Sequence, residues 1–215
     1  MAPLVPYLGI LLKGALVTLG LAALSLVFAS VIGVVIGMVA TSRSASARAF
    51  AKLYVETIRS VPLLVQLFFV YYALPLLANV SPSPYHAATL ALSVYGGAYM
   101  VEAVRSGILS VGTDQWMAAR SLGIRYRVMM LYIVAPQALR VTIPAAMGIF
   151  IDMLKGASVT SIIGFVELMQ TAVNIRNTIF ALSPIAAAAV LYFVMCFSLS
   201  RVGAGLERVL RYEDR

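Results

Sequence analysis

Two oppositely charged side chains stand inside an otherwise apolar stretch of the chain. Asp152 and Lys155 lie three residues apart in GIFIDMLKGASV, a spacing that puts them on one face of a helix. A charged group in such a stretch is costly unless it faces a protein interior or a water-filled path. Lys155 could bind the carboxylate of a zwitterionic solute and Asp152 its ammonium group. The alternative is that the two charges only neutralise each other near a membrane surface, with Lys155 reaching toward water.

Neutral polar side chains extend this candidate path. Ser158, Thr160 and Ser161 follow Lys155 closely and offer hydroxyl groups to a bound solute. Gln66 offers an amide from a separate apolar run, RSVPLLVQLFF. The candidate substrate-path residues are therefore Gln66, Asp152, Lys155, Ser158 and Ser161.

The sequence lacks the residue clusters of an enzyme or a metal site. It contains one histidine, His86, one cysteine, Cys196, and no G-x-x-x-x-G-K-[ST] phosphate-binding loop. We therefore expect no catalytic residue, no metal ligand and no cofactor bound by this chain. Any ATP must be hydrolysed by another subunit. His86 is interpreted as a loop residue and Cys196 as a packing residue.

The composition predicts an integral membrane protein. Hydrophobic residues make up 62% of the chain and charged residues 11%, which is more apolar surface than a water-soluble domain can bury. The net charge of +8 comes from basic residues spread over loops beside apolar runs. That distribution indicates membrane orientation and argues against nucleic-acid binding.

Five apolar runs predict a single all-α membrane bundle over residues 1–215. The expected spans are about 8–40, 61–78, 87–109, 141–164 and 179–202. Residues 126–140 are also apolar, but Arg140 would fall near the bilayer centre, where arginine costs on the order of 2.5–3.5 kcal/mol. We therefore expect this stretch at the membrane surface. Gly33 and Gly37 form a GxxxG pair that would let another helix approach closely.

The basic residues predict the orientation of the bundle. Thirteen of the sixteen Lys and Arg residues fall in the segments 41–60, 105–140 and 201–215. The opposite side has only Lys13, Lys155 and Arg176. By the positive-inside rule, the N-terminus lies outside and the C-terminus lies in the cytoplasm. The loop at about 110–140 is then cytoplasmic.

The segment DQWMAARSLG, residues 114–123, predicts a short helix in that loop. Asp114 can cap its start, and Gly123 can end it in a left-handed conformation. Its small residues leave room for a partner's backbone, and its apolar residues offer adaptable contacts. A plain connecting helix is the alternative. The candidate contact residues are Gln115, Met117, Ala118, Ala119, Arg120, Leu122 and Gly123.

The same segment resembles a known family motif. Met117-Ala118-Ala119, three residues, Gly123, nine residues, Ile133 and then Pro136 is similar to the EAA loop of ATP-binding-cassette (ABC) importer permeases. Met117 stands where that pattern has glutamate. The blocks 58–75, 96–123 and 136–168 resemble the polar amino acid branch of the family in order and spacing.

The resemblance implies a type I importer permease in the bacterial cytoplasmic (inner) membrane. Such a chain forms the translocation path for an amino acid together with a second permease chain. The resemblance also implies a cytoplasmic ABC ATPase dimer, which carries ATP and Mg²⁺ and contacts the helix at 115–123, the coupling helix of the family. An extracytoplasmic solute-binding protein would deliver the amino acid.

One block departs from the family pattern. Family members often read N-E-F-I, three residues, K-D-T-S, whereas this chain has Gly148-Ile149-Phe150-Ile151 and then Lys155-Gly156-Ala157-Ser158. Two carboxylates of the pattern are missing. Either the substrate differs, or a non-identical second permease supplies the polar contacts; we favour the heterodimer over a homodimer.

Three other functions are compatible with parts of the sequence. An ion-coupled secondary transporter would use Asp152 as an ion ligand, although five spans without an inverted repeat argue against it. An ABC permease for a solute other than an amino acid is a second alternative, and a membrane scaffold without transport is a third. Uptake into vesicles that requires ATP and a binding protein distinguishes the importer from the secondary carrier and the scaffold.

Overall fold

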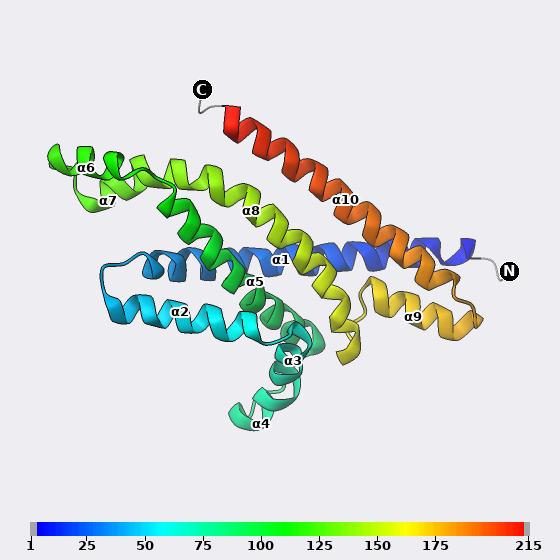
Figure 1. The fold of residues 1–215 in the computed structure, drawn as a ribbon. Helices are drawn as coiled ribbons and strands as arrows, with labels where there is room; N and C mark the ends of the chain where they lie inside the picture. The colour runs from blue at the N-terminus through cyan, green and yellow to red at the C-terminus, as the bar shows by residue number, and fades with distance from the viewer. Residues whose placement is uncertain (1–3, 213–215) are drawn as a thin grey trace.

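The computed structural model describes residues 4–212, which form helices and no β-strand. Figure 1 shows α6 and α7 at one end of the bundle and α9 with the start of α1 at the other. The predicted all-α architecture is confirmed for these residues. The α-helices are α1 (Leu8–Ala40), α2 (Ala45–Ser60), α3 (Leu63–Phe68), α4 (Leu74–Ala78), α5 (Pro84–Leu109), α6 (Thr113–Ser121), α7 (Tyr126–Met129), α8 (Ala135–Gly156), α9 (Leu168–Ile179) and α10 (Ser183–Tyr212).

Four helical segments among the described residues are long and apolar enough to cross a membrane. They are Val5–Ala40, Pro84–Leu109, Tyr126–Ile163 and Ser183–Leu210. A fifth crossing results when Ala45–Ser60 and Leu63–Ala78, which meet at an angle of 101°, are taken as one broken span.

Small residues let α1 pack tightly on α5. A Cβ atom at Gly33 would overlap the side chain of Met100 and lie 2.9 Å from its backbone carbon. A Cβ atom at Gly37 would lie 2.8 Å from Val104 Cγ1. Real Cβ atoms do not approach their neighbours so closely, so only glycine fits at either position. The predicted role of the GxxxG pair is confirmed.

Gly33→Leu should therefore lower the free energy of unfolding by about 1–3 kcal/mol, the usual cost of overpacking a filled interface. The measurement is the thermal unfolding midpoint of the purified protein. Gly20→Leu is the matched control, because Gly20 lies on the same helix and a Cβ atom added there would have no neighbour within 4 Å. An equal loss in both variants would mean that leucine in α1, and not the contact with α5, causes the effect.

The second apolar run forms a bent pair with the helix that precedes it. α2 ends at Ser60, Val61 is extended, and Pro62 precedes α3. The expected span start at residue 61 therefore falls in the bend between α2 and α3. The basic residues of 41–60 indicated a loop, but most of them lie on this amphipathic helix.

The fourth span begins earlier than expected. Helical structure runs from Tyr126 to Ile163, through a π turn at Met130–Val134 and a 3₁₀ turn at Ala157–Ile163. Pro136 does not interrupt it: the π turn lies immediately before this proline, and such local adjustments accommodate a proline within a membrane helix. The expected start near residue 141 is therefore wrong as a helix boundary, while the position of 126–140 at the membrane surface stays a prediction.

The fifth expected span is divided at its start. α9 ends at Ile179, and Phe180 adopts a left-handed conformation with φ of 50°. α10 begins at Ser183 and continues to Tyr212, beyond the expected end at residue 202. The start predicted at residue 179 is wrong because an apolar run does not reveal a left-handed break at a non-glycine residue.

A buried carboxylate ties α9 to α1 and α10. Glu167 is fully buried, and its side chain caps α9 by accepting from the backbone N–H groups of Met169 and Gln170, both at 2.8 Å. The Tyr192 hydroxyl donates to Oε2 at 2.7 Å and the Thr18 hydroxyl at 3.3 Å. Burial raises the pKa of the Glu167 carboxyl, and these four donors oppose that rise.

Candidate functional site

One stripe of α2 carries a row of charged side chains. Arg48, Lys52, Glu56 and Arg59 follow one another at intervals of four, four and three residues. Residues at this spacing are neighbours on one side of a helix. Lys52 Nζ lies 3.6 Å from Glu56 Oε1. The row is therefore a continuous polar strip along α2.

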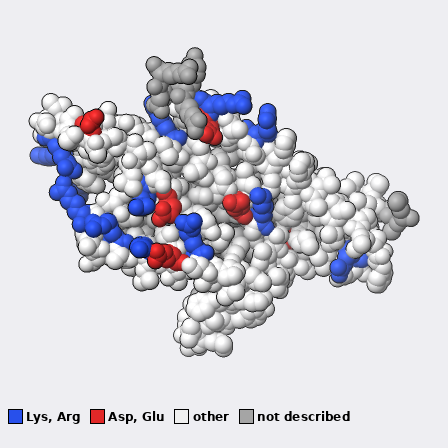
Figure 2. Space-filling model, viewed as in Figure 1, with Lys and Arg blue, Asp and Glu red and all other residues white. Residues whose placement is uncertain are grey.

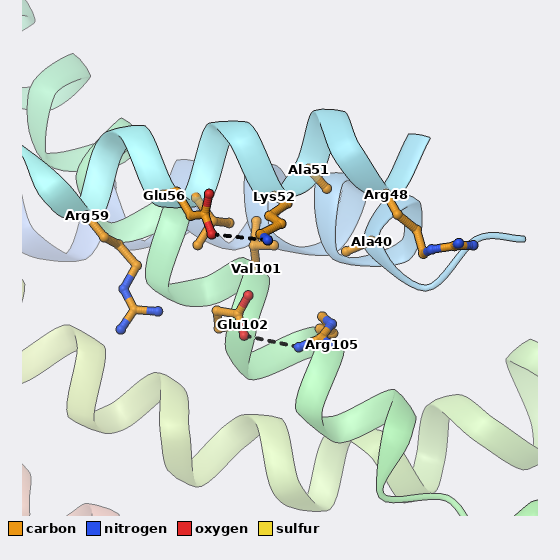
Figure 3. Close-up of a pocket in the computed structure, with 10 residues that line it drawn as sticks. Ala40, Arg48, Ala51, Lys52, Glu56, Arg59, Val101, Glu102 and Arg105 are labelled. Atoms are coloured by element: carbon orange, nitrogen blue, oxygen red, sulfur yellow. Dashed lines mark hydrogen bonds and ion pairs between the residues drawn. The ribbon is translucent and has the colours of Figure 1, made fainter. Parts of the chain in front are cut away.

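α5 supplies the facing wall of a groove. Arg105 Nη1 lies 3.4 Å from Glu102 Oε2, which confirms the ion pair that their spacing predicts. The Arg59 guanidinium lies over the Tyr99 ring at 4.9 Å from its centroid. Figure 3 shows the α2 row and the α5 pair lining one groove, which has a volume of about 440 Å³.

The polar strip continues from α5 to α8. The rings of Tyr99 and Tyr95 lie 5.0 Å apart on α5, and α5 packs against α8, which carries Asp152. Asp152 Oδ1 in turn lies 3.4 Å from Lys155 Nζ. Figure 2 shows acidic and basic side chains gathered over the middle of this face. We call this set the charged face: Arg48, Lys52, Glu56, Arg59, Glu102, Arg105, Asp152 and Lys155.

The charged face requires a polar neighbour. α5, α8 and the α2–α4 pair belong to segments apolar enough to cross a membrane. Within the chain, the side chains of Asp152 and Lys155 remain 69% and 60% exposed. Charged groups at membrane depth face a water-filled path or another protein surface. The charged face therefore lies exposed on this chain, where water, a partner chain or a solute can contact it.

The candidate substrate-path residues do not all meet in one place. Asp152 and Lys155 form the predicted pair. Ser158 donates to the carbonyl oxygen of Lys155 at 2.7 Å, and Ser161 donates to that of Ser158 at 2.8 Å. Their hydrogens thus bind local backbone, and only their oxygen lone pairs stay available to a solute.

The side-chain amide of Gln66 forms hydrogen bonds to the backbone of this chain. Its Nε2 donates to the carbonyl oxygens of Ile58 and Val61, both at 2.8 Å. These groups lie at the end of α2, where a helix leaves its last carbonyls unpaired. Gln66 therefore holds the bend between α2 and α3 in place.

α6 has the sharp C-terminal stop that Gly123 predicts. Gly123 adopts φ of 68°. The backbone N–H of Ile124 donates to the Ala119 carbonyl at 3.1 Å, and that of Gly123 to the Arg120 carbonyl at 3.0 Å. This pair of hydrogen bonds is a Schellman motif, which requires a left-handed residue at this position.

Two details of α6 differ from the prediction. The N-cap is Gly112, and Asp114 lies in the first turn, where its charge interacts favourably with the helix dipole without capping it. Ala119 is 2% exposed and packs on the bundle together with Trp116. The Ala119 side chain therefore packs α6 against the bundle and is not available to contact a partner.

The outward side of α6 is apolar. Met117 is 58% exposed and Leu122 is 78% exposed, with Gln115, Ala118 and Arg120 also exposed between them. Isolated apolar residues on a surface are common. Met117 on α6 and Leu122 at its C-cap are two large exposed apolar side chains at the end of the bundle farthest from α9 (Figure 1).

Sequence reasoning did not select the groove or Glu167 as functional features. The spacing of Arg48, Lys52, Glu56 and Arg59 was a usable signal, because it is helical and not loop-like. No sequence signal joins Glu167 to Thr18 and Tyr192, which are distant along the chain.

The chain matches known proteins over most of its length. Residues 29–212 match the family described as "Binding-protein-dependent transport system inner membrane component". The chain is 36% identical to the L-cystine transport system permease protein TcyB of Bacillus subtilis, over 94% of this chain and 86% of that protein. It is 29% identical to the arginine transport system permease protein ArtQ of the same organism, over 98% and 96%.

A solved structure shares the fold. The crystal structure of an amino acid ABC transporter with histidines superposes with a TM-score of 0.88 at 33% identity, covering 95% of this chain and 96% of that chain. Both the resemblance of the EAA-like loop and the type I fold are confirmed, and these relatives favour a transport subunit over an ion-coupled carrier, a scaffold or an enzyme. The chain belongs to the family of inner-membrane components of binding-protein-dependent transport systems.

Proposed function

We propose that this chain is a permease subunit of an ATP-driven importer for amino acids. The observation that supports the proposal most is the charged face, which gives helices of membrane-spanning length a polar side suited to a zwitterionic solute. The named relatives transport cystine and arginine. An amino acid offers the carboxylate and the ammonium group that such a face can bind.

The two ends of the bundle suit two different partners. We infer that α6 lies in the cytoplasm and contacts an ABC ATPase dimer through Met117 and Leu122, because the positive-inside rule orients it so. The other end, with α9, then lies outside and receives the solute-binding protein. ATP and Mg²⁺ would bind to the ATPase and not to this chain.

The charged face is proposed to be completed by a second permease chain. The family carboxylates missing at Ile149 and Gly156 favour a non-identical partner, which would supply them across the path. A homodimer is the alternative. The mass of the intact complex, measured after co-purification, distinguishes one permease sequence from two.

The proposed mechanism couples α6 to the charged face. When the two ATPase subunits close on ATP, they would draw together the α6 helices of the two permease chains. Because Ala119 of α6 packs against α5 and α8, the movement would be transmitted to those helices. The path then opens toward the binding protein, and hydrolysis resets it. The coupling is thus between two alternative arrangements of rigid bundles.

Uptake into vesicles tests this function. The permease, its ATPase and its second permease chain are placed in lipid vesicles with ATP inside and the binding protein outside. Uptake of an amino acid that requires both components is the expected result. Uptake driven by an ion gradient without ATP would overturn the proposal.

Asp152→Asn should slow uptake about tenfold, because losing one charged hydrogen bond to the solute removes on the order of 1.5 kcal/mol. The thermal unfolding midpoint should barely change, since exposed ion pairs contribute about 0–1 kcal/mol. Lys155→Gln should act likewise, and Lys13→Gln, an exposed lysine of α1, serves as the control. Unchanged uptake in both charged-face variants would assign the pair a neutralising role only.

A further inference from the structure

A second pocket lies at the α6 end of the bundle, outside the charged face. It has a volume of about 740 Å³ and lies between the turn after α1, on one side, and α6 with the start of α7, on the other. Its wall contains no Asp or Glu. The lining residues are Thr41, Ser42, Arg43, Ile108, Leu109, Val111, Thr113, Trp116, Arg120, Ile124, Tyr126 and Met129.

Two arginines give the pocket a cationic side. Arg43 comes from the turn after α1 and Arg120 from α6. Both are exposed, and within residues 4–210 neither has an ion-pair partner. Arg48 Nη1 donates to the carbonyl oxygens of Ser42 and Arg43 at 3.0 and 2.9 Å, which fixes the turn that presents Arg43. The pocket thus offers two unneutralised guanidinium groups at one opening.

The remaining wall is apolar and aromatic. Ile108, Val111 and Met129 are buried beneath it, and Leu109 adds an apolar side chain that is 62% exposed. Trp116 and Tyr126 stand at the same wall. Aromatic side chains of this kind are typical of the membrane–water boundary, where one end of the ring is apolar and the other is wet. The pocket therefore pairs a cationic edge with an apolar edge.

We propose that this pocket binds an anionic phospholipid, with the phosphate between Arg43 and Arg120 and the start of an acyl chain along Leu109 and Met129. Arginine pairs well with phosphate, and basic pockets at the cytoplasmic ends of membrane helices suit anionic headgroups. An ATPase segment is the other candidate occupant, and the experiment below distinguishes it from a lipid. The inference rests on the proposed function only in placing this end at the cytoplasmic membrane surface.

Native mass spectrometry of the intact permease–ATPase complex tests the proposal. The complex is reconstituted in equal parts of phosphatidylglycerol and phosphatidylcholine, extracted in mild detergent, and its retained lipids are counted. Arg43→Gln and Arg120→Gln should each lower phosphatidylglycerol retention about fivefold, as expected for one basic residue near a lipid surface. Arg43→Lys, which keeps the charge, should retain the lipid and shows that the turn still folds.

The control is Arg127→Gln, an exposed arginine at the same end that does not line the pocket. It should leave retention unchanged, and an equal loss there would overturn the proposal in favour of general surface charge. Unchanged retention in both pocket variants would also overturn it. Displacement of phosphatidylglycerol by inorganic phosphate would assign the pocket to a free anion, and retention only after removal of the ATPase would assign it to that partner. None of these readouts depends on uptake, so failure here is distinguishable from failure of the transport function.

Discussion

The double variant Met117→Asp, Leu122→Asp should abolish ATP-driven uptake. Both side chains are largely exposed in the isolated chain, so replacing them should change its folding little. In the assembled importer they would be the apolar anchors of the ATPase contact. Buried anchors of this kind contribute about 2 kcal/mol or more each, so losing both should weaken ATPase binding by at least about a hundredfold. The measurements are uptake and the amount of ATPase that co-purifies.

The matched control is Ala45→Asp, Ser46→Asp, which adds the same two charges at exposed positions in the first turn of α2. It should keep both uptake and ATPase binding near the unmodified level. Normal uptake in the α6 variant, or loss in the control as well, would contradict a docking role for the outward side of α6.

Glu167→Ala should destabilise the fold strongly. It removes the cap of α9 and leaves the Tyr192 hydroxyl without its acceptor, while the Thr18 hydroxyl can still donate to the Gly14 carbonyl oxygen at 3.0 Å. A lost cap costs about 1 kcal/mol, and each buried polar group left unpaired costs about 1–3 kcal/mol. We expect a loss of about 2–4 kcal/mol in the free energy of unfolding, which adds the lost cap and the unpaired Tyr192 hydroxyl. Thermal unfolding of the purified chain measures it.

The Glu167→Gln variant distinguishes the contribution of hydrogen bonding to stability from the contribution of packing. The glutamine oxygen can still accept from two donors, so this variant should lose clearly less stability than Glu167→Ala. Glu56→Ala, on the exposed part of α2, is the control for removing a carboxylate and should change little. Equal losses in Glu167→Ala and Glu167→Gln would show that the network around Glu167 is not what stabilises α9.

The sequence predicted the regular spans well, because hydrophobic length and small-residue spacing decide them locally. The expected ranges 8–40 and 87–109 agree closely with α1 and α5. The GxxxG contact and the left-handed stop at Gly123 also follow from local rules, since only glycine tolerates the close approach or adopts positive φ at no cost.

The irregular parts of the fold were not predictable in the same way. The bend at Val61 and Pro62 is stabilised by Gln66, whose two acceptors lie on the preceding helix and in the bend itself. The left-handed residue Phe180 interrupts an apolar run without any glycine or proline at that position. Composition describes the solubility of a segment, whereas these breaks depend on contacts that form only after the helices pack.

The candidate site was predicted in part for the same reason. Asp152 and Lys155 are neighbours on one helix, so their spacing was enough to pair them. Arg59 on α2 and Asp152 on α8 belong to helices that both pack on α5, where Tyr95 and Tyr99 lie, and no pattern within one segment could indicate this arrangement. The burial of Ala119 likewise depends on how α6 sits against α5 and α8.

Cysteine crosslinking from α6 tests the central claim most directly. The native Cys196 is replaced by serine, and Ala118→Cys is introduced on the exposed side of α6. In membranes containing the whole complex, a short crosslinker should join position 118 to the ATPase, and a thiol reagent that cannot cross the membrane should fail to label it from outside. Labelling from outside, or repeated failure to capture the ATPase while uptake is intact, would contradict the account of this chain as a permease coupled to a cytoplasmic ATPase.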